Sequence, residues 1–273
     1  MSALSVTDPA EDFTSDRAAR VGLADTVSQT LTLAWRATVK MRRSLEVMFD
    51  VTIQPLVFTA MFAYIFGGAV SGDVQSYLPL IITGLIGQTV LTACVATGVQ
   101  LRTDLDSGVF DRFKVLPIAR IAPLAGPMVA DMLRYLIAAV LTFAVGILIG
   151  YRPGGGFAGV TGAILLAVLA GWSLAWIFTF FGLVGRNAQA VQGISLLVMF
   201  PLTFLSNAFV PTETMPRPLE AFAEVNPVSL VITALRDLAN HGQVTGSVGW
   251  ALLGCAVVVA VFAPLSVRRF KKM

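Results

Sequence analysis

Residues 77–98 read YLPLIITGLIGQTVLTACVATG, a stretch without a charged side chain. At 1.5 Å per residue, a helix of this length crosses a hydrocarbon core of about 30 Å. The rest of the chain has the same character, because 56% of its 273 residues are hydrophobic and only 13% are charged. An ordinary soluble domain carries about 25% charged residues. The sequence therefore predicts a polytopic membrane protein.

Further apolar runs lie on both sides of this stretch. We place six spans at residues 49–68, 77–98, 128–150, 157–183, 193–210 and 248–266. Each is expected to be a helix, because a backbone exposed to lipid must satisfy its own hydrogen bonds, and the alternating pattern of a barrel is absent. The predicted fold is all-α, with residues 23–273 as a single transmembrane domain and residues 1–22 as a disordered cytoplasmic tail.

An amphipathic pattern covers residues 23–44, before the first span. At 100° per residue, most apolar side chains fall on one side and most polar ones on the other, although Leu33 and Arg42 break the pattern. Such a helix suits the membrane interface, where its bases face anionic headgroups, but packing against another protein would use the same stripe. The side chains assigned to this interfacial helix are Trp35, Arg36, Lys40 and Arg43.

The basic residues are concentrated on one predicted side of the membrane. Fifteen of the 19 lie in the N-terminal segment, in the connection after the second span, at Arg186 or in the last six residues. The opposite side has Arg152, Arg217 and Arg236. An excess of lysine and arginine marks the cytoplasmic side. We therefore expect both termini to be cytoplasmic.

Residues 211–240 contain a short apolar run, VSLVITAL, before the last span. This run is too short to cross the bilayer, and counting it as a span would move the basic tail outside. The sequence instead predicts two short helices divided at Asn226–Pro227. They would dip into the outer leaflet and return, as re-entrant segments do where protein shields their backbone.

The sequence contains few groups suited to chemistry. None of the lysines stands in a G-x-x-x-x-G-K-[ST] context, so no P-loop is present. His241 has no second histidine or cysteine nearby, which argues against a metal site. Asp131 and Arg134 lie near the cytoplasmic end of the third span, where a structural pair is favoured over a coupling-ion site. We expect no metal or cofactor in this chain.

The charged connection LRTDLDSGVFDRFKVLPIAR, residues 101–120, allows three interpretations. Its three aspartates offer a Mg²⁺ site, although the interleaved bases would compete with the cation. A solvated connector would not need its apolar residues. We favour a short amphipathic helix that begins at Asp106 or Ser107, is stopped by Pro117 and docks on a partner. The aspartates are Asp104, Asp106 and Asp111.

Two stretches, residues 101–120 and NAFVPTETMPRPLEAFAEVNPVSLVITALRDL at 207–238, resemble permease subunits of the second type of ATP-binding-cassette (ABC) exporter. The daunorubicin-resistance type of drug permease is the most similar class, and the resemblance covers residues 23–270. It implies a subunit that dimerises with a second copy or a sister permease and binds a separate ATPase subunit. That partner would hold ATP and Mg²⁺, so this chain would catalyse nothing.

The resemblance also assigns roles to residues. The connection after the second span would be a cytoplasmic coupling helix that fits against the ATPase, although Asp106 and Ser107 stand where many relatives have Glu before the glycine. Its residues are Asp106, Gly108, Phe110, Asp111, Arg112, Phe113, Pro117 and Arg120. The outer re-entrant motif falls on Pro211, Pro216, Asn226, Pro227 and Arg236.

The resemblance places the second and fifth spans at the centre of a dimer. Gly84, Gln88 and Thr92 share one face of the second span. Small and polar faces serve helix packing most often, and lining a substrate pathway is the alternative. The candidate pathway residues are Gln88, Thr92, Phe200, Thr203 and Asn207. Phe58, Phe62 and Phe66 form a stripe on the first span that we assign to lipid contact.

The predicted function is the permease subunit of an ATP-driven exporter for an amphipathic drug, antibiotic or lipid-like compound. Export of a lipid or a lipid-linked glycan is the alternative within transport, because related permeases share the architecture. A Mg²⁺-dependent membrane transferase using the three aspartates is the alternative from another class. No feature of the sequence indicates a nucleic-acid partner.

Overall fold

The computed structural model describes residues 23–43, 45–110, 121–210 and 215–272, and every regular element in these ranges is a helix. The elements are α2 (Leu23–Arg43), α3 (Leu45–Ser71), α4 (Val74–Asp106), α6 (Ala122–Ile149), α7 (Gly156–Val184), α8 (Ala188–Phe204), α9 (Arg217–Val225), α10 (Pro227–Arg236), the π-helix η2 (Asp237–His241) and α11 (Gly246–Lys271). In the described residues, α4, α6, α7 and α11 are long and apolar enough to cross a membrane, and α3 and α8 contain shorter apolar stretches. The prediction of an all-helical polytopic membrane protein is confirmed.

The helix ends follow from local chemistry. Asp73 caps α4, because its carboxylate accepts a hydrogen bond from the Ser76 backbone N–H at 2.7 Å. Asn187 caps α8 in the same way, through the N–H of Ala190 at 2.8 Å. Such side chains satisfy donors that the first helical turn leaves without partners. Gly150 follows α6 with φ of 119°, a left-handed conformation that favours glycine.

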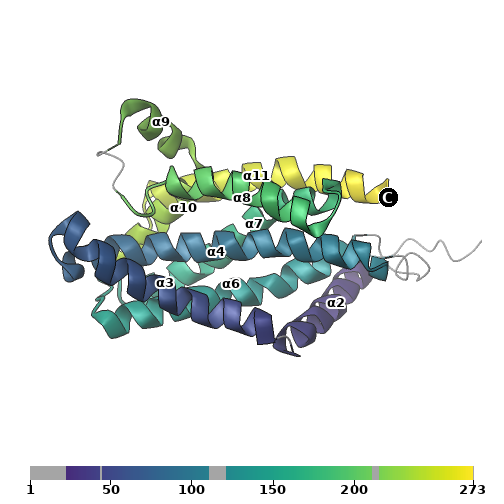
Figure 1. Cartoon of the computed structure of the whole chain (residues 1–273), viewed down its shortest axis with the longest axis horizontal. Coiled ribbons are helices and arrows are strands. Elements are labelled where there is room, and N and C mark those ends of the chain that lie inside the picture. Colours follow the sequence, from purple (N-terminus) through teal and green to yellow (C-terminus); the bar gives the residue numbers. More distant parts are fainter. Residues whose placement is uncertain (1–22, 44, 111–120, 211–214, 273) are drawn as a thin grey trace, which may run out of the picture.

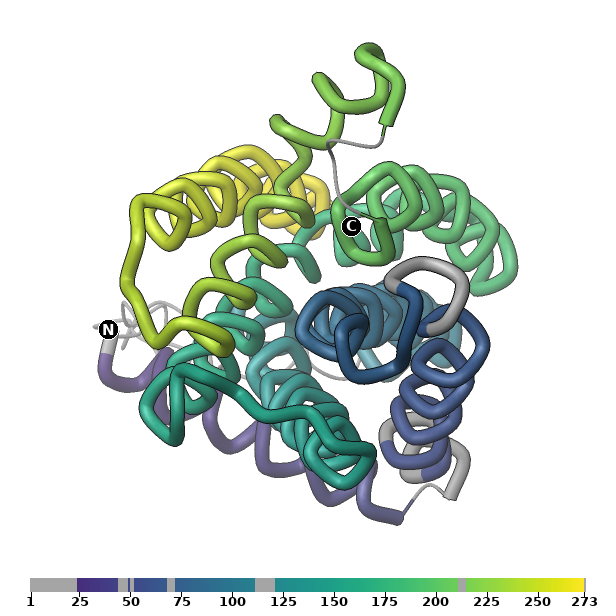
Figure 2. The backbone as a smooth tube through the Cα atoms, turned by 90° about the vertical axis from the view of Figure 1, so that its left-hand side faces the viewer, coloured from purple at the N-terminus to yellow at the C-terminus, as the bar shows by residue number. Residues whose placement is uncertain are grey.

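The long helices lie side by side along the long axis of the molecule (Figure 1). α4 occupies the centre of the bundle and packs against α3, α6, α7 and α8, as the end-on view also shows (Figure 2). α2 crosses one end of the bundle, where it packs on α6, and the C-terminal end of α11 lies at that same end. The turns from α3 to α4 and from α6 to α7 lie at the opposite end.

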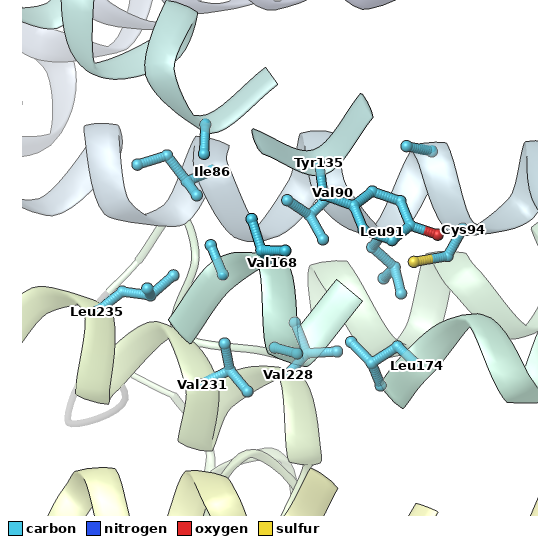
Figure 3. Packing of buried hydrophobic residues seen from close by; sticks show 14 of the residues in the cluster. Ile86, Val90, Leu91, Cys94, Tyr135, Val168, Leu174, Val228, Val231 and Leu235 are labelled. Carbon is cyan, nitrogen blue, oxygen red and sulfur yellow. The ribbon is translucent and has the colours of Figure 1, made fainter. Parts of the chain in front are cut away.

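The core is formed by α4, α6, α7 and α10. Figure 3 shows its central side chains, which include Ile86, Val90, Leu91, Cys94, Tyr135, Val168, Leu174, Val228, Val231 and Leu235. Glycine lets α4 and α7 approach closely: a Cβ on Gly98 would lie 2.3 Å from the carbonyl oxygen of Phe178. Small residues at such crossings let backbones pack tightly where water supplies no hydrophobic force between helices.

Two predicted boundaries need correction. The fifth span was predicted over residues 193–210, but α8 ends at Phe204, and Leu205 caps it. Its end is fixed by packing, because a Cβ on Gly84 of α4 would lie 1.9 Å from the carbonyl oxygen of Ala208 in the turn that follows. The helix expected to begin at Asp106 or Ser107 does not begin there, since α4 continues without interruption through Asp106.

The predicted pair of short helices is present. Asn226 separates α9 from α10, and its side chain accepts a hydrogen bond from the N–H of Val228 at 2.9 Å. α10 packs against α4, α7 and α11, so its backbone is shielded by protein. α9 instead projects away from the bundle in both views (Figures 1 and 2). The sequence therefore predicted the division at Asn226, but not the separation of α9 from the other helices.

α2 presents two apolar surfaces. Leu33, which breaks the predicted stripe, faces α6. A Cβ added to Gly126 of α6 would lie 2.6 Å from the Cβ of Leu33. Ala34 is buried as well. Val27, Leu31 and Trp35 are exposed on the other apolar surface, which fits a helix that both packs on the bundle and contacts the membrane interface.

Candidate functional site

The seam between α4 and α8 contains most of the predicted pathway residues. The Thr92 hydroxyl lies 3.8 Å from the sulfur of Met199 and also donates to the carbonyl of Gln88 at 3.0 Å. One end of the seam is closed by the contact between Gly84 and Ala208. Gln88 therefore lies along α4 between the contact of Gly84 with Ala208 and the contact of Thr92 with Met199.

Polar atoms along this seam are buried without partners. In the part of the chain that the structure describes, Oε1 of Gln88, Oγ1 of Thr203 and Oδ1 of Asn207 accept no hydrogen bond. Ser229 of α10 adds a fourth such oxygen. A buried polar group without a partner costs about 1–3 kcal/mol, so these atoms favour water or a polar ligand group beside them.

The outer motif holds the end of α8 in place. The Asn226 side-chain amide donates to the carbonyl of Leu202 at 2.9 Å. Asn207 donates to the Thr233 hydroxyl at 2.8 Å, and Arg236 donates to the backbone carbonyl of Asn207 at 2.9 Å. Three polar contacts from α10 and its N-cap residue thus fix the segment that carries Thr203 and Asn207. Pro216 caps α9 and Pro227 begins α10.

An aromatic pocket of about 230 Å³ lies at the same end of the bundle as the turn after α8. Phe62 stacks on Phe209 with ring centroids 4.9 Å apart, and Phe204 packs on Phe209 at 5.6 Å. Phe62 therefore packs against the turn after α8, and the assignment of the Phe58, Phe62 and Phe66 stripe to lipid contact stays a prediction. The pocket is lined by Phe62, Phe66, Tyr77, Phe204, Ser206, Phe209, Val210 and Met215.

Phe200 does not join the other predicted pathway residues. Its ring is 49% exposed on the outer face of α8, whereas Thr203 is buried. It stacks on Phe204 at 5.8 Å, which extends the row of rings that begins at the aromatic pocket. Phe209 and Tyr77 were not predicted from the sequence, where the three-phenylalanine stripe on α3 was the one signal of an aromatic surface.

The opposite end of the bundle joins the interfacial helix to the extension of α4. Lys40 of α2 and Asp104 of α4 form an ion pair at 3.0 Å, and Gln100 donates to the same carboxylate oxygen at 2.9 Å. Arg102 and Asp106 pair one turn apart on α4, with Nε 3.0 Å from the carboxylate oxygen. Arg102, one of the interleaved bases, thus engages Asp106 as the sequence predicted, whereas Asp104 is paired by Lys40 of α2, which the sequence did not predict.

The chain changes direction directly after α4. Gly108 has φ of 71°, and its N–H donates to the carbonyl of Leu105 at 3.2 Å. Val109 and Phe110 are helical again. Phe110 is buried and meets the ring of Phe270, in the last turn of α11, edge to face. The remaining residues predicted for the coupling and outer motifs lie outside the described ranges: Asp111, Arg112, Phe113, Pro117, Arg120 and Pro211.

Comparison with known proteins identifies the family. The ABC-2 type transporter family matches residues 28–239. The daunorubicin resistance ABC transporter permease protein DrrB1 of Streptomyces coeruleorubidus is 41% identical over 252 residues, which cover 92% of this chain and 89% of that protein. The chain belongs to the ABC-2 type transporter family. It is a transmembrane permease subunit of an ABC transporter.

Mycobacterial relatives are more distant. The probable doxorubicin resistance ABC transporter permease protein DrrC of Mycobacterium tuberculosis (strain CDC 1551 / Oshkosh) is 26% identical over 93% of the permease and 92% of its own length. The doxorubicin resistance ABC transporter permease protein DrrB of the same strain is 30% identical over 68% of the permease and 65% of its own length. Permease subunits of this kind are not catalytic, which replaces the transferase interpretation.

A polar cluster lies between α4 and α6 of the permease, near α2. Asp131 and Arg134 pair at 3.3 Å, and the Thr97 hydroxyl donates to the other carboxylate oxygen at 2.6 Å. A cavity of about 150 Å³ beside them is also lined by Lys40 and Asp104. The structure brings together the pair that the sequence predicted, and its internal contacts agree with a structural role.

Proposed function

We propose that the permease exports an amphipathic drug, antibiotic or lipid-like compound, powered by ATP that a separate ATPase subunit binds and hydrolyses with Mg²⁺. A second copy or a sister permease completes the membrane part of the exporter. The relatives named for daunorubicin and doxorubicin resistance support a drug as cargo. The absence of a P-loop from the sequence supports an external source of energy.

The proposed orientation places both termini in the cytoplasm of a bacterial cell. Basic residues favour this arrangement, because they gather in the N-terminal segment, after the second span and in the tail. α2 and the C-terminal end of α11 lie at one end of the bundle, which is the arrangement that the charge distribution requires (Figure 1). In this orientation the Lys40–Asp104 pair and Gly108 face the ATPase side.

The proposed pathway follows the seam between α4 and α8. The observation that carries it is the set of buried oxygens without partners at Gln88 of α4, Thr203 of α8 and Asn207 in the turn that follows. Such oxygens bind the polar part of an amphipathic molecule, while the aromatic pocket beyond them offers an apolar surface at the outer end. Binding a ligand costs less free energy at side chains without hydrogen-bond partners, because no hydrogen bond within the protein must break first.

Transport by the reconstituted complex tests this proposal. The permease is co-expressed with a P-loop ATPase subunit that co-purifies with it, and ATP-dependent daunorubicin movement is measured in proteoliposomes. Loss of one hydrogen bond of about 1 kcal/mol predicts that Gln88→Leu and Thr203→Val each reduce transport about fivefold. Basal ATP hydrolysis is expected to stay unchanged.

Thr161→Val is the matched control, since this hydroxyl lies on α7 and bonds the carbonyl of Phe157 in its own helix. Wild-type complex that hydrolyses ATP but moves no amphipathic compound would contradict the proposed function. Transport that survives both seam substitutions at the wild-type rate would contradict the proposed pathway alone.

A further inference from the structure

The first residues after α4 are fixed to a helix that is distant in sequence. Phe110 is only 6% exposed, and its ring centroid lies 5.6 Å from that of Phe270 with an interplanar angle of 76°. Edge-to-face contact of this kind is a favoured geometry for aromatic pairs. Phe270 belongs to the last turn of α11, and Ser266, one turn earlier on the same helix, is fully buried. The contact therefore joins the start of the 107–121 connection to the body of the bundle.

Local backbone geometry aims Phe110 at this contact. α4 ends at Asp106, and Ser107 and Gly108 still bond back to Thr103 and Leu105. The left-handed conformation of Gly108 then turns the chain, so that the helical residues Val109 and Phe110 leave the axis of α4. The Ser107 hydroxyl also donates to the carbonyl of Asp104 at 2.9 Å, so the hydrogen bonds of this turn all lie within residues 103–108, and the ring of Phe110 adds a contact to a distant helix.

We infer that Phe270 is a positioning residue for the ATPase coupling segment, so that α11 as well as α4 receives the movement of the ATPase. This inference rests on the proposed function. A rigid-body push on the connection after α4 reaches Phe110, and the ring contact passes it to the last turn of α11. α11 packs on α7 and α10, and α10 holds the outer end of α8. Phe270 thereby connects the coupling segment to the segment that carries Thr203 and Asn207.

Substitution of the two rings tests the inference in the complete complex. Phe270→Ala is expected to lower daunorubicin transported per ATP hydrolysed at least threefold, with co-purification of the ATPase unchanged. Phe270→Tyr keeps the ring and is expected to restore the wild-type ratio, whereas Phe270→Leu keeps only apolar bulk and is expected to stay low. Phe110→Ala combined with Phe270→Ala is expected to be no worse than the more affected single variant, because both remove one contact.

Val261→Ala provides the control on the same helix, since Val261 is 47% exposed. A second measurement is independent of transport: Phe270→Ala, but not Val261→Ala, is expected to raise hydrogen exchange at the amides of residues 109 and 110 at least tenfold. Unchanged exchange, a wild-type transport ratio in Phe270→Ala, full rescue by leucine or additive losses in the double variant would each overturn the inference. Wild-type complex without ATP-dependent transport would instead overturn the proposed function, and the exchange measurement would still decide whether Phe270 positions the segment.

Discussion

At the scale of single residues, glycines set how closely the helices of this permease approach. A Cβ on Gly84 would overlap the carbonyl oxygen of Ala208 at 1.9 Å, which is backbone and cannot rotate away. A Cβ on Gly193 of α8 would have no neighbouring atom within 4 Å. Substitution of these two helical glycines is therefore expected to have opposite effects on stability.

Gly84→Ala is expected to destabilise the permease by about 1–3 kcal/mol, the usual cost of overpacking a close contact. Gly193→Ala is expected to be neutral or to stabilise by up to about 1 kcal/mol, since alanine favours the helix and meets no neighbour. Thermal unfolding of the purified proteins in detergent measures both. Equal midpoints for the two variants would show that α4 and the turn after α8 are not in contact.

Part of this residue-scale detail follows from the sequence. The common face of Gly84, Gln88 and Thr92 was visible in the sequence. The contacts of Gly84 with Ala208 and of Thr92 with Met199 agree with the favoured role in helix packing, and Gln88 on the same face belongs to the proposed pathway. The residues that contact this face could not be predicted from the sequence, because they depend on where α8 ends. Phe209 remained hidden for the same reason, since its ring meets Phe62 only after the chain turns at the end of α8.

At the scale of elements, α2 is held mainly by packing. The ion pair between Lys40 and Asp104 involves a lysine side chain that is 65% exposed, so solvent screens the attraction. Against α6, by contrast, Leu33 and Ala34 lie over Gly126 at a distance that leaves no room for a side chain. The position of the interfacial helix is therefore set by its apolar contact with α6.

Lys40→Ala is expected to cost less than about 1 kcal/mol, as exposed ion pairs usually do. Gly126→Val is expected to displace α2 and to cost about 1–3 kcal/mol, because the new side chain must occupy the space of Leu33. Hydrogen exchange over residues 23–43 in nanodiscs distinguishes the two: it should rise strongly in Gly126→Val only. Gly249→Val on α11 is the control, since nothing lies within 4 Å of its Cβ position. Faster exchange in Lys40→Ala than in Gly126→Val would reverse the assignment.

Elements whose ends carry local signals were the predictable ones. Asn226 and Pro227 divide α9 from α10 through a cap and a residue suited to the first turn. The extension of α4 to Asp106 was missed, although the pairing of Arg102 with Asp106 four residues apart was a helical signal in the sequence. The π-helix η2 has no such signal. Its carbonyls at Leu238 and Asn240 pack closely over Gly155 and Gly154, so tertiary contact determines it.

At the scale of the whole molecule, burial separates a central helix from peripheral ones. In its most apolar window, 78% of α4 is buried, compared with 17% of α11. α4 therefore needs protein on all sides, while α11 presents its apolar side chains to lipid or to a second permease. Hydropathy alone predicted that both helices would be spans. It did not distinguish them, because an apolar residue has the same hydropathy whether it faces lipid or protein.

The orientation of the whole molecule can be measured with single cysteines. Both native cysteines, Cys94 and Cys255, are buried, so the wild type is expected to react little with a membrane-impermeant maleimide. Gln243 lies in the exposed turn before α11, and Arg186 lies in the exposed turn between α7 and α8, at opposite ends of the bundle (Figure 1). With both termini in the cytoplasm, Gln243→Cys should label nearly completely in intact cells, and Arg186→Cys should label only after the membrane is permeabilised. Labelling of Arg186→Cys from outside would invert the bundle, placing the Lys40–Asp104 pair and Phe270 where no ATPase subunit could reach them.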